Sequence, residues 1–449
     1  MQKQIPRLVI AGTNSGCGKT SVTCAILQAL VSRGLSVGAA KCGPDYIDPM
    51  FHSRIIGAKS SNLDAFFFEE NTLRELLWEN GKDCDVTIIE GVMGYYDGLG
   101  LTSTRASTYE LAQKTRSPVV LVVNARGAAL SVLAVIQGFL DFMPENNIRG
   151  VILNGCTAMS YESLAREIEA RFSLRAFGYL PQMPECSLES RHLGLVTAAE
   201  VENLREKMQR LAAQAEKSLD FAGLLALARG AEALDFAPLA LPAAGEEVRI
   251  GVAKDRAFCF YYEDSLHLLE KLGARLVPFS PLEDAALPDG LHGLYFGGGY
   301  PELYAKQLGQ NTSMRESVKR ALARGVPCIA ECGGFMYLTE KIGDAPMVGY
   351  LPGKSFDTGK LTRFGYVVLT AQKDNLLCRA GERIPAHEFH HWDADAAGEA
   401  FLAEKPSGKS WPCVHATEKF YAGYPHFHFY ANPQFAVRFL DACRKEKHA

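Results

Sequence analysis

The sequence lacks any apolar run close to the roughly 20 residues that a membrane-spanning helix needs. It also lacks a surplus of positive charge, because 47 basic and 51 acidic residues leave a net charge of −4, which argues against a nucleic-acid partner. The 12 cysteines show neither the CxxC spacing of zinc sites nor the density of a disulfide scaffold. The opening MQKQIPRLVIAGT has no secretory pattern. We therefore expect a cytoplasmic protein with reduced thiols and no membrane contact.

Short apolar segments alternate with helical patterns along the first half of the chain. The segments are RLVIAGT (7–13), VGAAKC (37–42), DVTIIEG (85–91), PVVLVVNA (118–125) and RGVILNG (149–155). Strands that are apolar on both faces and separated by helices are typical of a parallel sheet covered by helices on both sides. An Ala/Leu/Glu-rich stretch over 198–240 is predicted to be helical. LPAAGEE (241–247) then interrupts the pattern like a linker.

A second alternation follows the linker. Its segments are VRIGVAKD (248–255), GLYFGGG (293–299), VPCIAECGG (326–334) and FHFYANP (427–433), before a C-terminal helix. The sequence thus predicts two α/β domains, over 1–240 and 248–449.

The run GTNSGCGKT (12–20) lies between a predicted strand and a predicted helix, which is the setting of a P-loop. Its glycines would let backbone N–H groups bind phosphate at the helix N-terminus. Lys19 would reach the β- and γ-phosphates, and the Thr20 hydroxyl would bind Mg²⁺. The spacing departs from the usual form, since Thr13 stands where the first glycine normally does. The predicted ATP-binding residues are Gly12, Thr13, Asn14, Gly16, Cys17, Gly18, Lys19, Thr20 and Asn154, the last either reading adenine or forming a turn.

Acidic residues follow two of the predicted strands, where the ligands of open α/β sheets bind. Carboxylates facing a triphosphate imply Mg²⁺ between them, and we predict Thr20, Asp45 and Glu90 as its ligands. Asp48 and Asp97 are as well explained by turns or caps. If functional, these two and Tyr46 would face the acceptor or support the metal ligands.

Four motifs carry a resemblance to a known family. AGTNSGCGKT, KCGPDYIDPMFH, NLDAFF and IIEGVMGYYDG resemble those of cobyrinic acid a,c-diamide synthases of the cobalamin pathway. The ATP domain of that family resembles dethiobiotin synthetase, which implies a P-loop NTPase-type domain over 1–240. The combination of GPDYIDP with EGVMGYYDG is far more specific than the P-loop alone.

In the second half, Cys332 lies at a predicted strand-to-helix turn, where a nucleophile projects and nearby N–H groups can bind an oxyanion. We predict Gly298, Gly299 and Gly333 as those donors and His426 as the partner of the thiol. These residues resemble a class I glutamine amidotransferase domain, with a flavodoxin-like fold. Most such domains have a glutamate two residues after the histidine, whereas here that residue is His428, so the third member of the triad stays open.

HEFHH (387–391) formally matches the H-E-x-x-H signature of zinc proteases, which requires a helix. Pro385 and the alternation of Phe389 and Trp392 with polar residues favour a strand, and hence a structural or substrate-facing role. Arg363 is either a holder of a substrate carboxylate or a surface residue.

An ATP site and an ammonia source on one chain imply amide synthesis through an acyl phosphate. The resemblance implies cobyrinic acid as acceptor, amidated on its a and c side chains, with ATP, Mg²⁺ and glutamine. Ni-sirohydrochlorin and hydrogenobyrinic acid are alternative acceptors, and a homodimer is compatible with the sequence. A switch ATPase with a glutamine-sensing domain is the alternative from another class, but it would be expected to have lost Cys332 or His426, and both are present.

Overall fold

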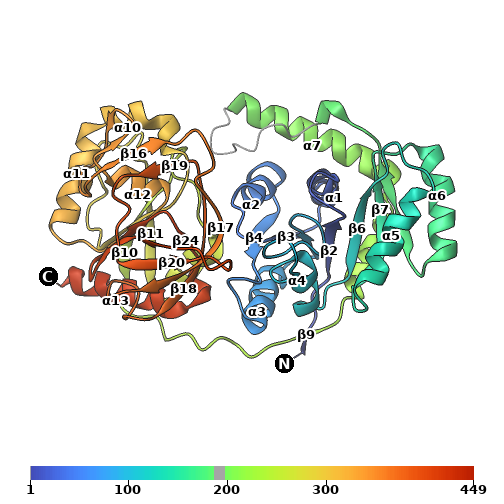
Figure 1. The fold of residues 1–449 in the computed structure, drawn as a ribbon, viewed down its shortest axis with the longest axis horizontal. Helices are drawn as coiled ribbons and strands as arrows, with labels where there is room; N and C mark the ends of the chain where they lie inside the picture. The colour runs from blue at the N-terminus through green and yellow to red at the C-terminus, as the bar shows by residue number, and fades with distance from the viewer. Residues whose placement is uncertain (1, 187–197, 449) are drawn as a thin grey trace. The chain divides into compact units, whose positions relative to one another are not determined.

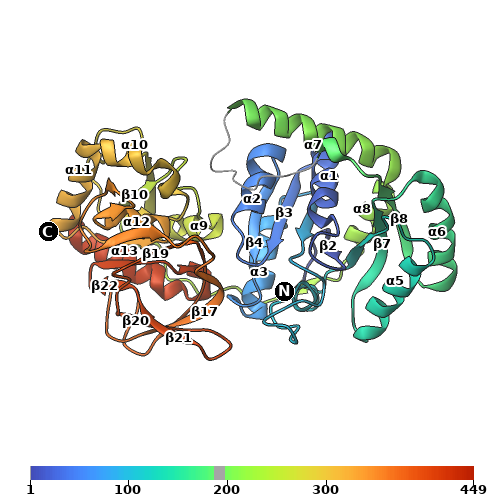
Figure 2. The ribbon, with the colours of Figure 1, turned by 45° about the horizontal axis from the view of Figure 1, so that its top comes forward.

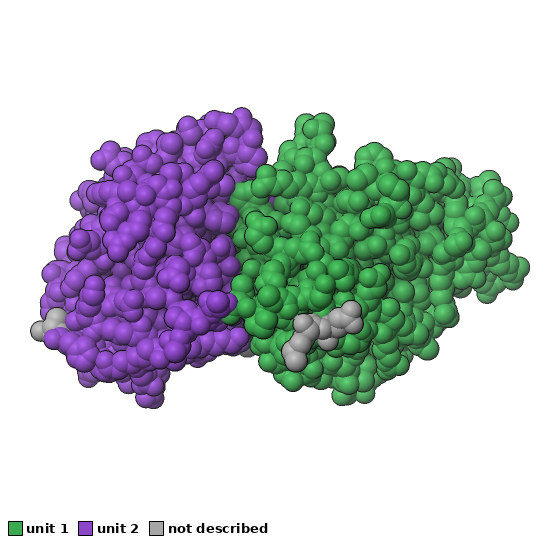
Figure 3. All heavy atoms as spheres, turned by 90° about the horizontal axis from the view of Figure 1, so that it is seen from below, with its two compact units in different colours: residues 1–239 green, residues 240–449 purple. Residues whose placement is uncertain are grey.

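The computed structural model describes residues 2–186 and 198–448 and divides into two compact units, Met1–Leu239 and Ala240–Ala449 (Figure 3). Each unit has its own sheets and hydrophobic core. Within the described residues, no helix combines the length and apolar character needed to cross a lipid bilayer.

The first unit is built on a seven-stranded sheet with the order β4-β3-β5-β2-β6-β7-β8 (Figure 1). All six neighbouring pairs are parallel. The five apolar segments of the first half form its central strands, as predicted, and the edge strands β4 and β8 are additional. The strands are β2 (Arg7–Gly12), β3 (Val37–Cys42), β4 (Lys59–Leu63), β5 (Val86–Glu90), β6 (Val119–Asn124), β7 (Ile148–Asn154) and β8 (Arg175–Leu180), with a separate pair β1 (Gln2–Lys3) and β9 (Leu234–Asp235).

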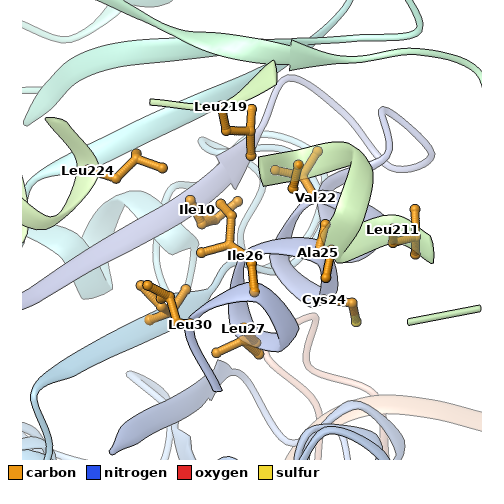
Figure 4. Close-up of a cluster of buried hydrophobic side chains, with 14 of the residues drawn as sticks. Ile10, Val22, Cys24, Ala25, Ile26, Leu27, Leu30, Leu211, Leu219 and Leu224 are labelled. Atoms are coloured by element: carbon orange, nitrogen blue, oxygen red, sulfur yellow. The ribbon is translucent and has the colours of Figure 1, made fainter. Parts of the chain in front are cut away.

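Helices connect these strands and cover the sheet (Figure 2). They are α1 (Lys19–Ser32), α2 (Ile47–Phe51), the π-helix η1 (His52–Ile56), α3 (Glu70–Gly81), α4 (Thr108–Lys114), α5 (Ser131–Phe142), α6 (Ala158–Arg171), η2 (Pro184–Cys186), α7 (Ala198–Ser218) and α8 (Phe221–Arg229). The predicted helical stretch after 198 is therefore two helices. Figure 4 shows Val22 and Ile26 of α1 packed with Ile10 of β2 and Leu211 of α7. This packing fixes α1, and with it the loop that precedes α1.

The second unit contains a six-stranded sheet with the order β11-β10-β12-β13-β23-β22, parallel except for the edge strand β22. Its strands are β10 (Val248–Ala253), β11 (Ala274–Phe279), β12 (Gly293–Phe296), β13 (Cys328–Glu331), β22 (His415–Thr417) and β23 (Phe420–Gly423). The helices are α9 (Glu263–Lys271), η4 (Pro301–Tyr304), α10 (Ala305–Gln310), α11 (Thr312–Ala323), α12 (Gly333–Leu338), η5 (Phe429–Ala431) and α13 (Pro433–Lys447).

Two further sheets of the second unit, of mostly antiparallel strands, were not predicted. One has the order β21-β20-β17-β18-β24 and the other β15-β14-β16-β19. Their strands are β14 (Lys341–Ile342), β15 (Ala345–Pro346), β16 (Lys354–Asp357), β17 (Arg363–Ala371), β18 (Arg383–His390), β19 (Trp392–Ala394), β20 (Phe401–Glu404), β21 (Ser410–Cys413) and β24 (His426–Phe427).

The prediction of a strand over 427–433 is wrong. β24 ends at Phe427, and residues 429–431 form a short 3-10 helix. The imidazole of His428 accepts a hydrogen bond from the backbone N–H of Tyr430, and Asn432 caps α13 in the same way through Gln434 N–H. These two local caps favour helical turns over an extended chain.

Candidate active site

The P-loop connects β2 to α1 and requires glycine at two positions. Gly16 and Gly18 have φ of +81° and +94°, a backbone conformation that L-residues avoid. A Cβ at Gly18 would lie 1.9 Å from Nδ2 of Asn154, and a Cβ at Gly12 would lie 2.5 Å from Sγ of Cys17. Side chains at Gly12 and Gly18 would therefore push the loop away from Cys17 and Asn154. With glycine at both positions, the loop backbone can pack closely against these two residues.

Asn154, predicted to contact adenine, lies at the end of β7 against this loop. Its Nδ2 donates a hydrogen bond to the carbonyl of Cys17, 2.9 Å away. In the loop itself, the hydroxyl of Thr13 donates to Oδ1 of Asn14, whose Nδ2 donates to the Ser15 carbonyl. The role of Asn154 in reading adenine stays a prediction. Its hydrogen bond to Cys17 shows that it also supports the P-loop.

Glu90, the last residue of β5, is fully buried at the centre of a charged cluster. Its Oε1 accepts a hydrogen bond of 2.8 Å from the Thr20 hydroxyl and lies 3.0 Å from Nζ of Lys41. Its Oε2 lies 3.0 Å from Nε2 of His52. The structure therefore brings together the predicted pair, Thr20 of α1 and Glu90 of β5.

Lys41, at the end of β3, links Glu90 to Asp48 of α2, whose Oδ2 lies 2.5 Å from its Nζ. Burial alone would lower the pKa of Lys41, but the two carboxylates raise it above its usual value. Burial raises the pKa of Asp48 to about 6, and Lys41 opposes that rise. The pKa of Glu90 lies well below its usual range, because Lys41 and His52 outweigh the effect of burial.

Burial and the nearby Lys41 ammonium together lower the pKa of Lys19. Lys41 and His52 were not predicted as site residues, although both belong to KCGPDYIDPMFH. Their pairing with Glu90 depends on the order of the strands in the sheet, so no local signal identified them.

The other predicted polar residues of this edge take local roles. Asp45 Oδ1 accepts a hydrogen bond from Ile47 N–H, and its charge helps to raise the pKa of Lys41. Tyr46 is buried and precedes α2. Asp97 Oδ2 accepts a hydrogen bond from Gly94 N–H, which fixes the turn after β5. Their predicted roles toward metal or acceptor stay predictions.

The donor atoms at this edge fit Mg²⁺ in one respect. The Thr20 hydroxyl and the Glu90 carboxylate are adjacent oxygen donors, the ligand type that Mg²⁺ prefers when it is bound together with substrate phosphates. Across the part of the chain that the structure describes, no three His, Cys, Asp or Glu side chains are arranged to hold a metal ion by themselves. These donors therefore suit a cation that shares its coordination with a nucleotide.

Cys332 lies in a strained turn between β13 and α12. Its backbone has φ 48° and ψ −103°, which is rare for a residue with a side chain. Its N–H donates to the Gly423 carbonyl, and its carbonyl accepts from Met336 N–H. A Cβ at Gly334 would lie 2.4 Å from the Phe296 carbonyl oxygen, so the turn has no room for a larger residue there. This is the predicted strand-to-helix elbow.

The three predicted oxyanion glycines lie beside the cysteine and the histidine. A Cβ at Gly333 would lie 3.1 Å from the backbone nitrogen of Gly299. A Cβ at Gly298 would lie 2.5 Å from Cε1 of His426. Glycines from two loops thus lie close together beside Cys332, and their role as oxyanion donors stays a prediction.

His426 is buried in β24, opposite His387 of β18. The two rings are stacked with centroids 5.2 Å apart, and burial keeps the pKa of His387 well below its usual value. Nδ1 of His426 lies 3.3 Å from Oε2 of Glu331, a residue that the sequence reasoning missed. Burial lowers the pKa of His428 to about 3, and its ring lies against Tyr262.

The Cys332 thiol is buried among carboxylates. Burial raises its pKa above the usual value, and the nearby Glu302 raises it further. Glu302 itself has a pKa raised to about 7 by burial. A thiol in such surroundings keeps its proton until a base removes it, and His426 is the predicted base.

The first four residues of HEFHH lie on β18, so the strand prediction is confirmed for residues 387–390. Phe389 is exposed, whereas Glu388 and His390 are buried, as the predicted alternation requires. His387 is also buried, because β24 covers it.

Arg363 of β17 lies 4.3 Å from the Trp411 ring centroid and 3.8 Å from Glu388. It borders a cavity of about 290 Å³, which is lined by Thr362, Arg363, Lys405, Lys409 and Trp411.

Comparisons with known proteins agree with this arrangement. Residues 8–196 match the CobQ/CobB/MinD/ParA nucleotide binding domain, and residues 249–434 match the CobB/CobQ-like glutamine amidotransferase domain. The chain is similar to the cobyrinate a,c-diamide synthase of Caldanaerobacter subterraneus subsp. tengcongensis, with 41% identity over 97% of this chain and 98% of that protein. It is also similar to the synthases of Thermoplasma volcanium (39%; 98% of both chains) and Listeria innocua (38%; 98% of this chain and all of that protein). The chain therefore belongs to the cobyrinate a,c-diamide synthase family and is a glutamine-hydrolysing ligase with a nucleotide-binding domain.

Proposed function

We propose that this protein amidates the a and c side-chain carboxylates of cobyrinic acid in cobalamin biosynthesis, using ATP and ammonia released from glutamine. The observation that carries the proposal is that a P-loop with its Thr20–Glu90 pair and a strained cysteine elbow occur in one chain that aligns end to end with cobyrinate a,c-diamide synthases. The resemblance inferred from the motifs and the full-length similarity support the same acceptor.

To the domain predicted over residues 1–240 we assign ATP binding and activation of the carboxylate. A carboxylate is a poor electrophile, so transfer of the γ-phosphoryl group to it supplies a good leaving group. Lys19 would bind the β- and γ-phosphates, and the N–H groups of the P-loop would hold the phosphate oxygens. Mg²⁺, when bound between Thr20, Glu90 and the nucleotide, would neutralise charge on the phosphates.

Lys41 has a further task in this unit. Held between Glu90 and Asp48, its ammonium places a fixed positive charge next to Lys19 and the P-loop. A preorganised cation at this edge would stabilise the negative charge that gathers on the transferred phosphoryl group. Asp48 would then act by orienting Lys41, which fits its predicted supporting role better than direct contact with a metal.

To the domain predicted over residues 248–449 we assign glutamine hydrolysis. His426 would take the proton of Cys332, and the sulfur would attack the side-chain amide of glutamine. N–H groups of the loops that contain Gly298, Gly299 and Gly333 would bind the oxyanion. The proton would pass from His426 to the departing ammonia, and water would then hydrolyse the thioester to glutamate.

The acceptor carries several carboxylates around an apolar macrocycle. The cavity that contains Arg363, Lys405 and Lys409 beside Trp411 offers cations next to an aromatic ring. Such a surface could hold one of those carboxylates, in line with the role predicted for Arg363.

The free state of all 12 cysteines supports a reducing compartment, the cytoplasm. A homodimer, and the absence of nucleic-acid and membrane partners, complete the proposal.

The acceptor is tested by offering wild-type protein cobyrinic acid, hydrogenobyrinic acid and Ni-sirohydrochlorin separately, with ATP, Mg²⁺ and glutamine, and identifying products by mass spectrometry. The proposal predicts an a,c-diamide from cobyrinic acid at the highest kcat/KM. A product from Ni-sirohydrochlorin alone would reassign the acceptor. ATP hydrolysis without an amide product from any acceptor would favour a switch ATPase.

A further inference from the structure

Glu331 is a buried carboxylate that neither the motifs nor the family resemblance assigns. It is the last residue of β13 and directly precedes Cys332, with 1% of its surface exposed. Its Oε1 accepts a hydrogen bond of 2.8 Å from the Tyr295 hydroxyl of β12. Its Oε2 lies 3.3 Å from Nδ1 of His426. The carboxylate thus connects two neighbouring strands to the predicted catalytic histidine.

The surroundings of Glu331 leave His426 as its basic partner. Throughout residues 2–186 and 198–448, no lysine or arginine forms an ion pair with Glu331. The titratable groups that its charge affects are Cys332 and three tyrosines, Tyr261 of the loop after β10, Tyr295 of β12 and Tyr421 of β23. A buried carboxylate is costly unless a hydrogen-bond donor or a cation compensates it. The imidazole is the group near it that can become a cation.

His426 is held on three sides. Glu331 lies at Nδ1, the stacked ring of His387 covers one face, and the backbone of Gly298 lies against Cε1. His387 is kept neutral by its burial and cannot replace Glu331 as a charged partner. Glu331 is therefore the anion positioned to fix the tautomer and orientation of the catalytic imidazole.

The sheet topology explains how a residue before the cysteine reaches the histidine. Glu331 pairs with Gly423 across β13 and β23, and the chain then turns through Tyr424 and Pro425 to His426. At the position where most related domains carry the acid, His428 instead caps the turn at 429–431. The carboxylate has thus moved from the histidine's own segment to the strand that carries the nucleophile.

We propose that Glu331 is the positioning residue of the glutaminase site and takes the place of the missing acid of the triad. The inference rests on the proposed roles of Cys332 and His426. Glu331 accepts the hydrogen bond of Nδ1–H and so leaves the lone pair on Nε2. Nε2 takes the thiol proton as the S–C bond forms, and gives that proton to the departing ammonia as the C–N bond breaks. Glu331 acts only through this hydrogen bond and exchanges no proton.

The test compares wild type with Glu331→Gln and Glu331→Asp in the full chain, with ATP, Mg²⁺ and cobyrinic acid present. For Glu331→Gln we expect the kcat of glutamate release to fall by about 10²-fold or more, with the KM for glutamine nearly unchanged. Ammonia-dependent amidation should stay at the wild-type rate, and Glu331→Asp should recover part of the lost kcat. Tyr295→Phe, which removes the other hydrogen bond to the carboxylate, should lower kcat only a few-fold.

Glu382→Gln is the control for a structural carboxylate of the same unit, because Glu382 pairs with Arg438 away from the cysteine. It should leave both reactions intact. A wild-type kcat in Glu331→Gln, or an equal loss of glutamine- and ammonia-dependent turnover, would overturn the proposal. If Glu331→Gln fails to fold, the proposal is tested with Glu331→Asp and Tyr295→Phe. The quantity compared is then the ratio of glutamine-dependent to ammonia-dependent turnover in these variants. Absence of glutamate release in the wild type would instead refute the proposed function itself.

Discussion

The two charged clusters of this chain both lie at the ends of parallel strands, yet their charges differ. Lysines compensate the buried carboxylates of one cluster, whereas the other contains carboxylates without lysine or arginine partners among the described residues. At the P-loop, Glu90 and Asp48 are compensated by Lys41, and Lys19 lies beside them. Around Cys332 the neighbouring charges are carboxylates, Glu302 and Glu331 among them. In the described part of the chain, no lysine or arginine forms an ion pair with either of these two glutamates.

The difference corresponds to the substrates that each unit is proposed to handle. A triphosphate carries several negative charges and needs fixed cations. The side-chain amide of glutamine is neutral, and its hydrolysis needs a base, a thiol and backbone donors. Similar sheets thus support opposite electrostatics, and the residues that follow each strand decide which chemistry is possible.

The largest expected effect comes from removing a cation of the first cluster. Lys19→Met keeps the length of the side chain but loses the charge at the phosphates, so amidation should fall on the order of 10³-fold. The loss should be the same with glutamine and with ammonia, because both reactions need the acyl phosphate. Product formation from cobyrinic acid with each nitrogen source measures it. Survival of the ammonia reaction would contradict the role of the P-loop.

Removing Lys41 tests the charge balance of the same cluster. Lys41→Met leaves Glu90 and Asp48 buried without their cation, which should cost about 3–5 kcal/mol of folding stability at pH 8. The loss should shrink at pH 5, where the carboxylates can take up protons, and Lys41→Met with Asp48→Asn should recover part of it. Thermal unfolding at both pH values measures this. A loss that does not depend on pH would refute the charge balance.

Glu302→Gln tests the anionic cluster through its pH dependence. The folded-state pKa of Glu302 is raised from 4.5 to about 7, so its contribution to stability is fully present below pH 4.5 and is lost as the pH rises through 7. The variant should therefore be more stable than wild type at pH 8, by roughly 3 kcal/mol at most, and similar to it at pH 4. Tm measured across this range gives the result.

The same variant also reports on the thiol. Without the Glu302 charge, Cys332 should be alkylated by iodoacetamide several-fold faster at pH 8, because that charge raises the pKa of the thiol. Equal alkylation rates in Glu302→Gln and wild type would mean that the charge of Glu302 does not affect the Cys332 thiol.

The smallest expected effect concerns backbone strain at the elbow. Cys332 has a positive φ, and glycine adopts this conformation at little cost. Cys332→Gly should therefore be more stable than Cys332→Ala by about 1 kcal/mol, although both lack the thiol. Their Tm values provide the comparison, and equal Tm values would mean that the turn is not strained.

Much of this arrangement could be predicted because its signals are local. The apolar segments, the glycine-rich loop and the cysteine turn are each contained within about ten residues, so the central strands, the P-loop and the elbow were placed from sequence. The short edge strand β4, KSSNL, has a single apolar residue and resembles a loop. The mostly antiparallel sheets of the second unit depend on pairings between distant segments, which no local pattern reveals.

The missed site residues share one property. The role of Lys41 depends on Glu90, which is 49 residues away in the sequence, and the role of Glu331 depends on His426, which is 95 residues away. A lone lysine or glutamate at the end of a strand is interpreted as a surface charge until the order of the strands is known. His428 occupies the position at which most related domains carry the glutamate of the triad, and here the chain folds it into a local cap.

The most direct test of the account is Cys332→Ala, incubated with cobyrinic acid, ATP and Mg²⁺, and supplied with either glutamine or ammonium. We expect no diamide and no glutamate with glutamine, and a near wild-type rate of diamide formation with ammonium. Loss of both reactions would mean that the cysteine site does more than supply ammonia. Retention of the glutamine reaction would contradict the central claim that Cys332 releases the nitrogen.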